Sequence, residues 1–333
     1  MKYSGPESTR TTRLAPKFQT HRVEFPADFA GKRLDQALAQ LLPQYSRTRI
    51  QRWIEDGAVR VNGLVPRVRD LVVSGQTATV EARIEAETDV AAENLPLDIV
   101  HSDASMFIVN KPPGLVVHPG AGNREHTLQN GLLARDPKLA KVPRAGLVHR
   151  IDKDTSGLLV VARTLDAHTR LVAELAAHEI EREYLAVCVG AMTGGATIDE
   201  PIGRHRTTRT KMAIRSDGRE AITHYRIERR FPGHTLARVK LETGRTHQIR
   251  VHLTHVGYPL VGDKVYGGRR KIPKNATPEL LRALENFPRQ ALHAARLTLT
   301  HPRSGKRVTF EAPLPDDLTR LLDVLARDAQ AEE

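Results

Sequence analysis

Cysteine and long apolar runs are scarce in this chain of 333 residues, and acidic residues are fewer than basic ones. Its single cysteine, Cys188, excludes a disulfide within the chain, which suits a reducing compartment and predicts a cytoplasmic protein. Because Cys188 lies in the apolar run YLAVCVG, we interpret it as a packing residue rather than a nucleophile. No run approaches eighteen apolar residues, which excludes a membrane-spanning helix.

Signatures of bound cofactors and of several enzyme classes are missing as well. The chain has no G-x-G-x-x-G, no Walker P-loop and no G-x-S-x-G nucleophile elbow. DTSG at 154–157 is typical of half an aspartic protease site, but the second copy that the dyad needs is missing. The histidines of HQIRVHLTH have no carboxylate or thiol among them, which argues against a metal site. We therefore expect neither a cofactor nor a metal.

Basic residues, by contrast, are in excess. Lys and Arg number 51 against 39 Asp and Glu, which gives a net charge of +12. This balance favours a polyanionic partner, with nucleic acid as the first candidate, although a merely basic protein remains the simple alternative.

The N-terminal third contains the pattern of a small basic module. LDQALAQLL has apolar residues at helical spacing, and RTRIQRWIED predicts a second helix with Ser46 as its N-cap. Trp53 falls on the apolar face of that helix and is expected in the core. In VRVNGLV, the pair Asn62-Gly63 predicts a hairpin turn between two short strands.

Charge and composition also predict the domain boundaries. Beyond the module, strand-like runs such as LLVVA and TLARVKLE alternate irregularly with helical segments, without regular βαβ units. That pattern favours a mixed α+β domain. We expect a basic flexible arm at 1–22, the basic module at 23–80, an acidic linker at 81–96 and a catalytic domain at 97–325.

The stretch HRIDKDTSGLLVVA (149–162) places charges at the mouth of an apparently buried strand. Asp154 reads as a turn residue, but Asp152 needs a cation or donated hydrogen bonds to remain ionised in such a place. Arg150 would point the other way on an extended segment. Residues 243–267 offer Arg250, one turn into a predicted helix for which Thr246 is a plausible N-cap.

These segments together resemble the pseudouridine synthases of the RluA family. HRIDKDTSGLLVVA resembles the catalytic motif of that family, with Ile151 where leucine is usual. The other matching segments are KPPGLVVHPG (111–120), REYLAVCVG (182–190) and GRTHQIRVHLTHVGYPLVGDKVYG (244–267). The basic module resembles an S4 RNA-binding domain.

The resemblance implies a fold, a reaction and a partner. The expected fold is α+β, with a mixed, largely antiparallel sheet, flanking helices and a preceding S4 domain. The expected substrate is uridine in 23S ribosomal RNA, in the large ribosomal subunit or its precursor, and the enzyme is expected to be a monomer. The segments VPRAGLVHRIDKDTSG and RQALHA point to the D-type branch, whose target is the helix 69 stem-loop, and the C-type branch is the main alternative.

Matched to the family motifs, three residues acquire chemical roles. Asp152 would be the catalytic aspartate, either attacking C1′ or removing the C2′ proton, in a pocket closed to water. Arg250 would pair with it, and Tyr184 would pack on the base and could accept the C5 proton in the last step. The uridine must leave its stack, and Arg150 would fill the vacated space.

Further basic residues are expected to hold RNA phosphates. Arg245 precedes a predicted helix and could hold a phosphate there. The remaining candidates for RNA binding are Arg204, Arg206, Arg209 and Lys211 in the second domain, and Arg47, Arg49 and Arg52 in the basic module.

Two other functions remain open on the sequence. A non-catalytic RNA-binding or ribosome-assembly factor would use only the S4 module and the basic loops. A hydrolase would use Asp152 and Asp154 and would cleave its substrate or release a base.

Overall fold

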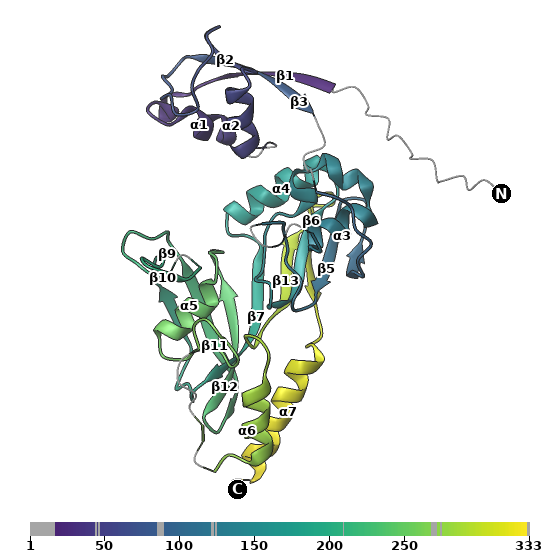
Figure 1. Ribbon diagram of the computed structural model, residues 1–333, viewed down its shortest axis with the longest axis vertical. Helices are drawn as coiled ribbons and strands as arrows, with labels where there is room; N and C mark the ends of the chain where they lie inside the picture. Colours follow the sequence, from purple (N-terminus) through teal and green to yellow (C-terminus); the bar gives the residue numbers. More distant parts are fainter. Residues whose placement is uncertain are drawn as a thin grey trace, which may run out of the picture. The chain divides into compact units, whose positions relative to one another are not determined.

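The computed structural model describes residues 17–43, 45, 47–84, 90–120, 123, 125–208, 210–267, 272–273 and 275–331. The chain divides into two compact units, at 1–87 and at 88–333. Figure 1 shows the first as a small sheet with two helices, and the second as a long twisted sheet with helices against it.

The N-terminal unit is a three-stranded antiparallel sheet covered by two helices. The sheet has the order β1-β3-β2, with β1 at Lys17–Glu24, β2 at Val59–Val61 and β3 at Thr77–Ile84. A 3₁₀ turn, η1 (Ala27–Phe29), leads to α1 (Leu34–Leu41) and α2 (Arg47–Glu55). The apolar faces of both helices pack on the sheet, and Trp53 is buried there as expected. Ser46, the expected N-cap, lies outside the described residues.

The Asn62-Gly63 turn forms as the sequence predicts, but the hairpin is shorter. Both residues have positive φ, 48° and 84°, which is the backbone that the primed hairpin turns require. Beyond the turn only one bridge forms, between Val61 and Leu64, and β2 pairs with β3 instead.

The arm and the linker that we expected differ from the structure. Residues 17–22 belong to β1, which pairs with β3 along its whole length, and residues 81–84 belong to β3. Residues 90–96 lie against the second unit, where the Asn130 side chain donates to the Ala91 carbonyl and Glu93 N–H donates to the Asn130 carbonyl. Part of the expected linker is therefore held in place by hydrogen bonds to Asn130.

The C-terminal unit contains a nine-stranded mixed sheet with the order β4-β5-β6-β13-β7-β12-β11-β8, with β14 added beside β13. Among the pairings of the described strands, only the short contact between β13 and β6 is parallel. The largely antiparallel α+β fold is thus confirmed. The strand bounds are as follows: β4 Asp98–Ser102, β5 Met106–Lys111, β6 Ser156–Ala162, β7 Glu181–Val189, β8 Ala196–Asp199, β11 Ile222–Phe231, β12 His234–Leu241, β13 Leu292–Thr300 and β14 Arg307–Glu311. A separate two-stranded sheet joins β9 (Ile202–Arg204) to β10 (Met212–Ile214).

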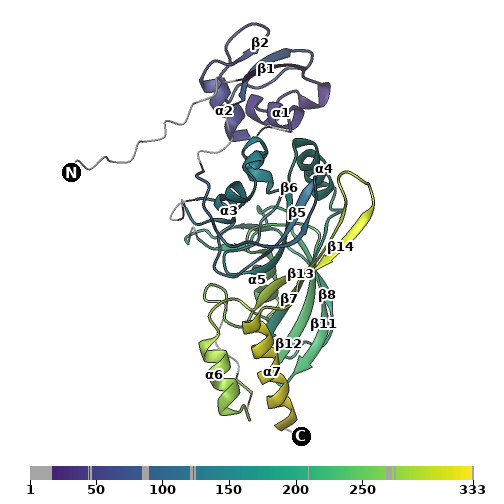
Figure 2. The same cartoon turned by 90° about the vertical axis from the view of Figure 1, so that its right-hand side faces the viewer.

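Helices cover both faces of this sheet, as Figure 2 shows. The buried side chains of β5 alternate, so that Phe107 and Val109 face one core while Met106 and Ile108 face another. The first core includes α3 (Leu128–Arg135) and α5 (Gln248–His255), and the second includes α4 (Leu165–Ala176). On the part of the sheet around β7, α6 (Pro278–Asn286) and α7 (Asp316–Ala331) close a third core. Short 3₁₀ segments, η2 (Pro137–Lys141) and η3 (Pro143–Gly146), lead to the HRID segment.

Candidate active site

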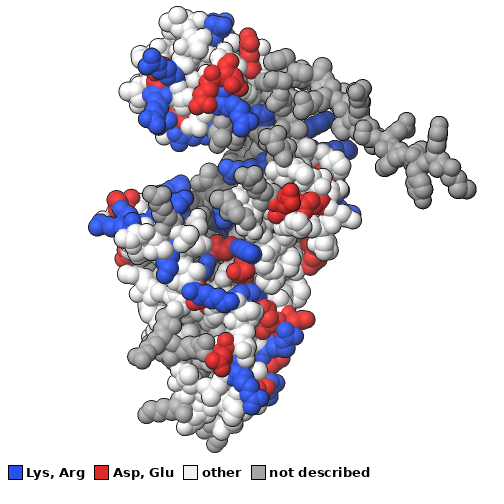
Figure 3. All heavy atoms as spheres, viewed as in Figure 1, with Lys and Arg blue, Asp and Glu red and all other residues white. Residues whose placement is uncertain are grey.

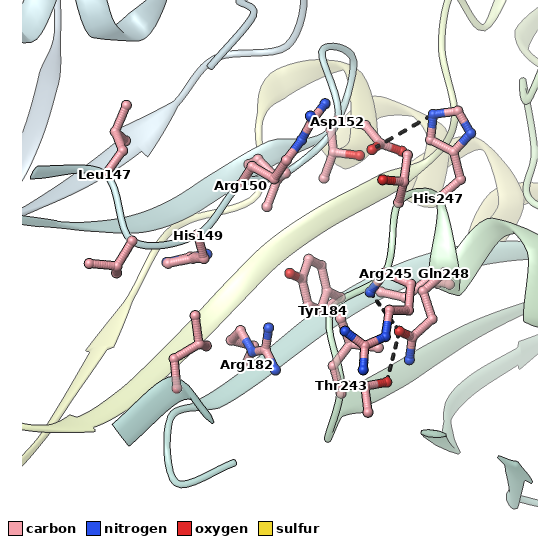
Figure 4. Close-up of a pocket in the computed structure, with 18 of the residues that line it drawn as sticks. Leu147, His149, Arg150, Asp152, Arg182, Tyr184, Thr243, Arg245, His247 and Gln248 are labelled. Atoms are coloured by element: carbon pink, nitrogen blue, oxygen red, sulfur yellow. Dashed lines mark hydrogen bonds and ion pairs between the residues drawn. The ribbon is translucent and has the colours of Figure 1, made fainter. Parts of the chain in front are cut away.

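A cleft of about 850 Å³ opens in the C-terminal unit, at the upper end of the range for small-molecule sites. It is lined by the segment 147–152 before β6, by β7 and by residues 241–250 between β12 and α5. In Figure 4, Tyr184 lies between the segment that carries Arg150 and Asp152 and the segment that carries Arg245.

The cleft brings together the two residues that the sequence pairs across 98 positions. Arg250 Nη1 donates to Asp152 Oδ2 at 3.0 Å, and the Arg250 side chain is only 6% exposed. Asp152 itself is 16% exposed, so it faces the cleft while its counter-ion lies behind it. The Asp152 carboxylate is open to the cleft, whereas we expected a pocket closed to water.

Sequence reasoning missed Asp263, which holds Arg250 from the other side. Its two carboxylate oxygens accept from Arg250 Nε at 2.7 Å and Nη2 at 2.8 Å, a bidentate pair. Burial raises the pKa of Asp263, but hydrogen bonds and charge from Arg250 and the N–H groups of Tyr266 and Val265 outweigh it and hold the pKa below its usual value. Asp263 stands in the segment LVGDKVYG, and its Oδ1 also accepts from the backbone N–H groups of Val265 and Tyr266.

A second missed group approaches the other oxygen of Asp152. His247 Nε2 lies 4.0 Å from Asp152 Oδ1, and His247 Nδ1 is 2.8 Å from the Tyr266 hydroxyl. That hydroxyl also accepts from the backbone N–H of Met212 at 2.8 Å, so its own proton is available for Nδ1. The arrangement favours the tautomer that carries its proton on Nε2, toward Asp152.

Tyr184 lies on β7 and faces the cleft, as the resemblance implies. It is 5% exposed and packs in the same core as Ile249 and Leu292. Burial raises the pKa of Tyr184, so its hydroxyl remains protonated near neutral pH. A neutral, buried ring suits packing on a base better than removal of a proton.

The turn that carries Asp152 is fixed from three directions. Lys111 is fully buried and donates to the Lys153 carbonyl at 2.8 Å, and burial lowers the pKa of Lys111 to about 7. Arg289 Nη1 donates to the Asp154 carbonyl at 3.0 Å. His149 Nε2 accepts from the Val160 N–H at 3.2 Å, and burial lowers its pKa to about 3, so the ring is neutral. His149 therefore supports the turn.

The start of α5 differs from the prediction. The N-cap is His247, in the left-handed region with φ 59°, and its side chain makes no capping bond. The expected cap, Thr246, is therefore wrong. The side chain of Gln248, the first residue of α5, fixes the segment that leads into the helix. Its oxygen accepts from the Arg245 N–H at 2.8 Å and from the Thr243 hydroxyl at 2.9 Å.

Two of the arginines expected to bind RNA line the cleft. Arg150 is exposed, and no hydrogen bond from its side chain is found among the described residues. Arg245 is half-buried, and its Nε donates to the Glu220 carbonyl at 2.8 Å.

The other basic candidates lie outside the cleft. Arg204, Arg206 and Lys211 belong to the β9–β10 hairpin, where Figure 3 shows Lys and Arg side chains on the surface, and Arg209 lies outside the described residues. Arg215 of the same segment is paired with Asp217.

In the N-terminal unit, α2 carries the three remaining arginines. Arg47 pairs with the buried Asp35 at 2.7 Å, so its guanidinium is already engaged in an ion pair within the domain. Arg49 lies over the ring of Trp53, with its Cζ 5.2 Å from the centroid. Arg52 is exposed.

Two further searches concern the described residues alone. They contain no group of three or more His, Cys, Asp or Glu side chains arranged to hold a metal ion. None of the helices that the structure describes has the length and apolarity needed to cross a bilayer.

Two family models match the chain. Residues 105–255 match the family described as RNA pseudouridylate synthase, and residues 32–75 match the S4 domain. The first match contains Asp152, Tyr184 and Arg250, and the second contains α1 and α2.

Solved structures show the same fold. The human protein "RNA Pseudouridylate Synthase Domain Containing 1" superposes with a TM-score of 0.53 at 26% identity, covering 72% of this chain and 97% of that one. "RNA Pseudouridylate Synthase Domain Containing 4", also human, gives a TM-score of 0.55 at 24% identity, covering 69% and 93%.

Curated relatives are much closer in sequence. The chain is 53% identical over 309 residues to "Ribosomal large subunit pseudouridine synthase D" of Pseudomonas aeruginosa, covering 93% of this chain and 97% of the relative. It is also 53% identical over 299 residues to the protein of the same name from Escherichia coli K12, covering 90% and 92%. The chain therefore belongs to the RNA pseudouridylate synthase family, enzymes that isomerise uridine in RNA to pseudouridine.

Proposed function

We propose that this enzyme isomerises uridines of the large-subunit (23S) ribosomal RNA, with Asp152 as the catalytic residue. The names of the relatives support the substrate, because they are large-subunit enzymes that match over nearly their whole length. One observation carries the catalytic assignment. Asp152 is a carboxylate in the cleft whose only guanidinium partner among the described residues, Arg250, is itself buried and fixed.

The charges around Asp152 suit a reactive carboxylate. Arg250 carries one positive charge and is shared between Asp152 and Asp263, so the three groups together are net negative. Asp263 makes two of the three hydrogen bonds to the guanidinium, which leaves Asp152 with a single one. Arg250 therefore orients Asp152 without cancelling its charge, as either attack on C1′ or removal of the C2′ proton requires.

Tyr184 is proposed to pack on the extruded uracil. Its ring faces the cleft from β7, and the raised pKa keeps the hydroxyl neutral. That protonation state does not favour Tyr184 as the base that takes the C5 proton. Arg150, exposed at the cleft and flanking the same turn as Asp152, is proposed to stack in the space that the uridine leaves.

RNA binding outside the cleft is proposed for two surfaces. The β9–β10 hairpin offers Arg204, Arg206 and Lys211, with Arg209 in the same loop. In the S4 unit, α2 offers Arg52 and, in part, Arg47 and Arg49. Phosphate contacts of this kind position an RNA without reading its sequence.

The target within the RNA is proposed to be the helix 69 stem-loop, with other 23S sites of the C-type branch as the alternative. A cytoplasmic location and a monomeric state stay predictions. Mapping pseudouridines in ribosomal RNA from cells that lack this protein tests the target. We expect loss of modification at helix 69 and restoration by the wild-type gene. Loss elsewhere in the 23S RNA would favour the alternative, and an unchanged map would contradict the proposed substrate.

A further inference from the structure

Four arginines line the cleft without a carboxylate partner among the described residues: Arg144, Arg150, Arg182 and Arg245. The other two buried arginines of this unit, by contrast, are paired. Arg250 has two carboxylates, and Arg289 pairs with Asp317 at 2.7 Å. Arg182 is therefore the one arginine among the described residues that is buried and has no carboxylate partner.

Arg182 differs from the other three because it is buried. It is only 6% exposed, and burial lowers the pKa of its guanidinium. Nη2 donates to the Glu242 carbonyl at 2.9 Å, while Nε has no partner among the described residues. Its surroundings are tight, since a Cβ on Gly244 would come within 2.6 Å of Nη1.

A buried guanidinium with one neutral acceptor is costly for the fold. Removing a charge from water destabilises the fold unless an opposite charge compensates for it. The Glu242 carbonyl satisfies one of five N–H groups and supplies no charge, and it also accepts from His178 Nδ1 at 2.7 Å. The fold therefore keeps a cation that its own residues do not neutralise.

The position of Arg182 relates it to the base-binding residue. Residues 182 and 184 face the same side of β7, with residue 183 on the other side. Positions two apart along a strand are separated by about 6.6 Å. The distance from Arg182 to the Tyr184 ring is therefore no more than the length of one nucleotide. Figure 4 shows both side chains at the cleft, next to one another. The anionic groups of an RNA substrate are its phosphates, because uracil is neutral.

We propose that Arg182 is a binding site for one backbone phosphate of the substrate RNA, next to the extruded uridine. This proposal rests on the proposed RNA substrate and adds the subsite that anchors the extruded nucleotide. The phosphate would supply the negative charge that the residues around Arg182 do not provide. The Arg182 Nε–H would donate a hydrogen bond to it. A planar fork of donors matches a phosphate better than a lysine ammonium does.

The test compares Arg182→Met and Arg182→Lys with the wild-type protein on a 23S RNA fragment that contains the target uridine. Single-turnover rates of pseudouridine formation at increasing protein concentration give the apparent dissociation constant. We expect Arg182→Met to raise it at least tenfold, and to reduce the slope of its logarithm against the logarithm of salt concentration by about one. Arg182→Lys should recover part of the affinity.

A second arm identifies the partner. RNA fragments with a single uncharged methylphosphonate, placed in turn at each phosphate around the target, should show one position that weakens wild-type binding about tenfold. The same replacement should leave Arg182→Met unchanged, because the interaction is already lost. If every position affects both proteins equally, the phosphate assignment is overturned.

Thermal unfolding separates this role from a structural one. Replacing an uncompensated buried charge by methionine should leave the melting temperature unchanged or raise it. A lower melting temperature with unchanged RNA binding would show that Arg182 only holds the loop at Glu242, and would overturn the proposal. Wild-type protein that fails to modify the fragment would contradict the proposed substrate, and this inference with it, whereas an active wild type with unaltered variants contradicts the inference alone.

Discussion

Asp263→Asn is the change that best isolates how Arg250 is held behind Asp152, the carboxylate that we propose to be catalytic. The side chain keeps its shape and one acceptor oxygen, but an amide now faces the N–H groups of Arg250 across a buried contact. One charge-assisted hydrogen bond, worth about 1.5–3 kcal/mol, is replaced by a donor–donor contact, and the other becomes a weaker bond to a neutral amide oxygen. Because Arg250 retains Asp152 as a partner, we expect the free energy of unfolding to fall by about 3 kcal/mol, the low end for breaking a buried pair.

Activity should fall together with stability. Arg250 would no longer be held on its far edge, and its whole charge would act on Asp152. We expect single-turnover pseudouridine formation to slow by about 10- to 100-fold, equivalent to about 1.4–2.7 kcal/mol of barrier. Guanidinium denaturation measures the stability, and the rate is measured on a 23S RNA fragment under conditions in which the variant is folded.

Asp136→Asn is the matched control. Asp136 accepts two hydrogen bonds from Arg163, at 2.8 and 3.1 Å, and does not line the cleft. It should lower stability while the rate stays within about twofold of wild type. The reasoning is refuted if Asp263→Asn is as stable and as fast as wild type, or if both variants lose the same activity.

Three further outcomes are expected. Gly157→Ala should destabilise the protein by about 2–4 kcal/mol in chemical denaturation, because φ is +111° and a Cβ would meet the Ala294 backbone; wild-type stability would disprove the crowding. Burial lowers the pKa of His168 and of His293 to about 4, below the unfolded value, so the unfolded chain binds more protons between pH 6.5 and 4. These two histidines alone should therefore lower stability by roughly 2–4 kcal/mol from pH 7.5 to pH 5, and a flat profile would contradict this. The fragment 88–333 should fold cooperatively and bind RNA more weakly than the full chain, and an aggregated fragment would argue against the observed boundary.

Local sequence patterns predicted much of the N-terminal unit, because its helices and its turn depend on residues that are close in the sequence. Apolar spacing fixed α1 and α2, and Asn62-Gly63 fixed the turn. Tertiary packing decided what the patterns missed. After Gly63 only Leu64 pairs back, through one bridge to Val61. The strand β2 pairs with β3 instead.

Composition misplaced the arm and the linker. Residues 17–22 are polar and basic, yet they pair with β3, because backbone hydrogen bonds do not depend on side-chain charge. Residues 90–96 were assigned to the linker, yet Leu95 and the neighbouring Leu97 pack closely against Gly131.

At the site, the sequence predicted the contact between Asp152 and Arg250 but missed the neighbours of this pair, Asp263 and His247. The motifs were sufficient to pair Asp152 with Arg250. Asp263 was overlooked because its partner is 13 positions away on another element, and a lone acid in a loop gives no sign of burial. The approach of His247 to Asp152 depends on a left-handed backbone that residue type does not predict.

The most direct test of the account is pseudouridine formation by Asp152→Asn on the 23S RNA fragment. Asp166→Asn, an exposed carboxylate on α4, serves as the control. We predict that Asp152→Asn forms no detectable pseudouridine, while its RNA affinity stays within about twofold of wild type and Asp166→Asn is fully active. Pseudouridine formation by Asp152→Asn at a rate near wild type would contradict the central claim.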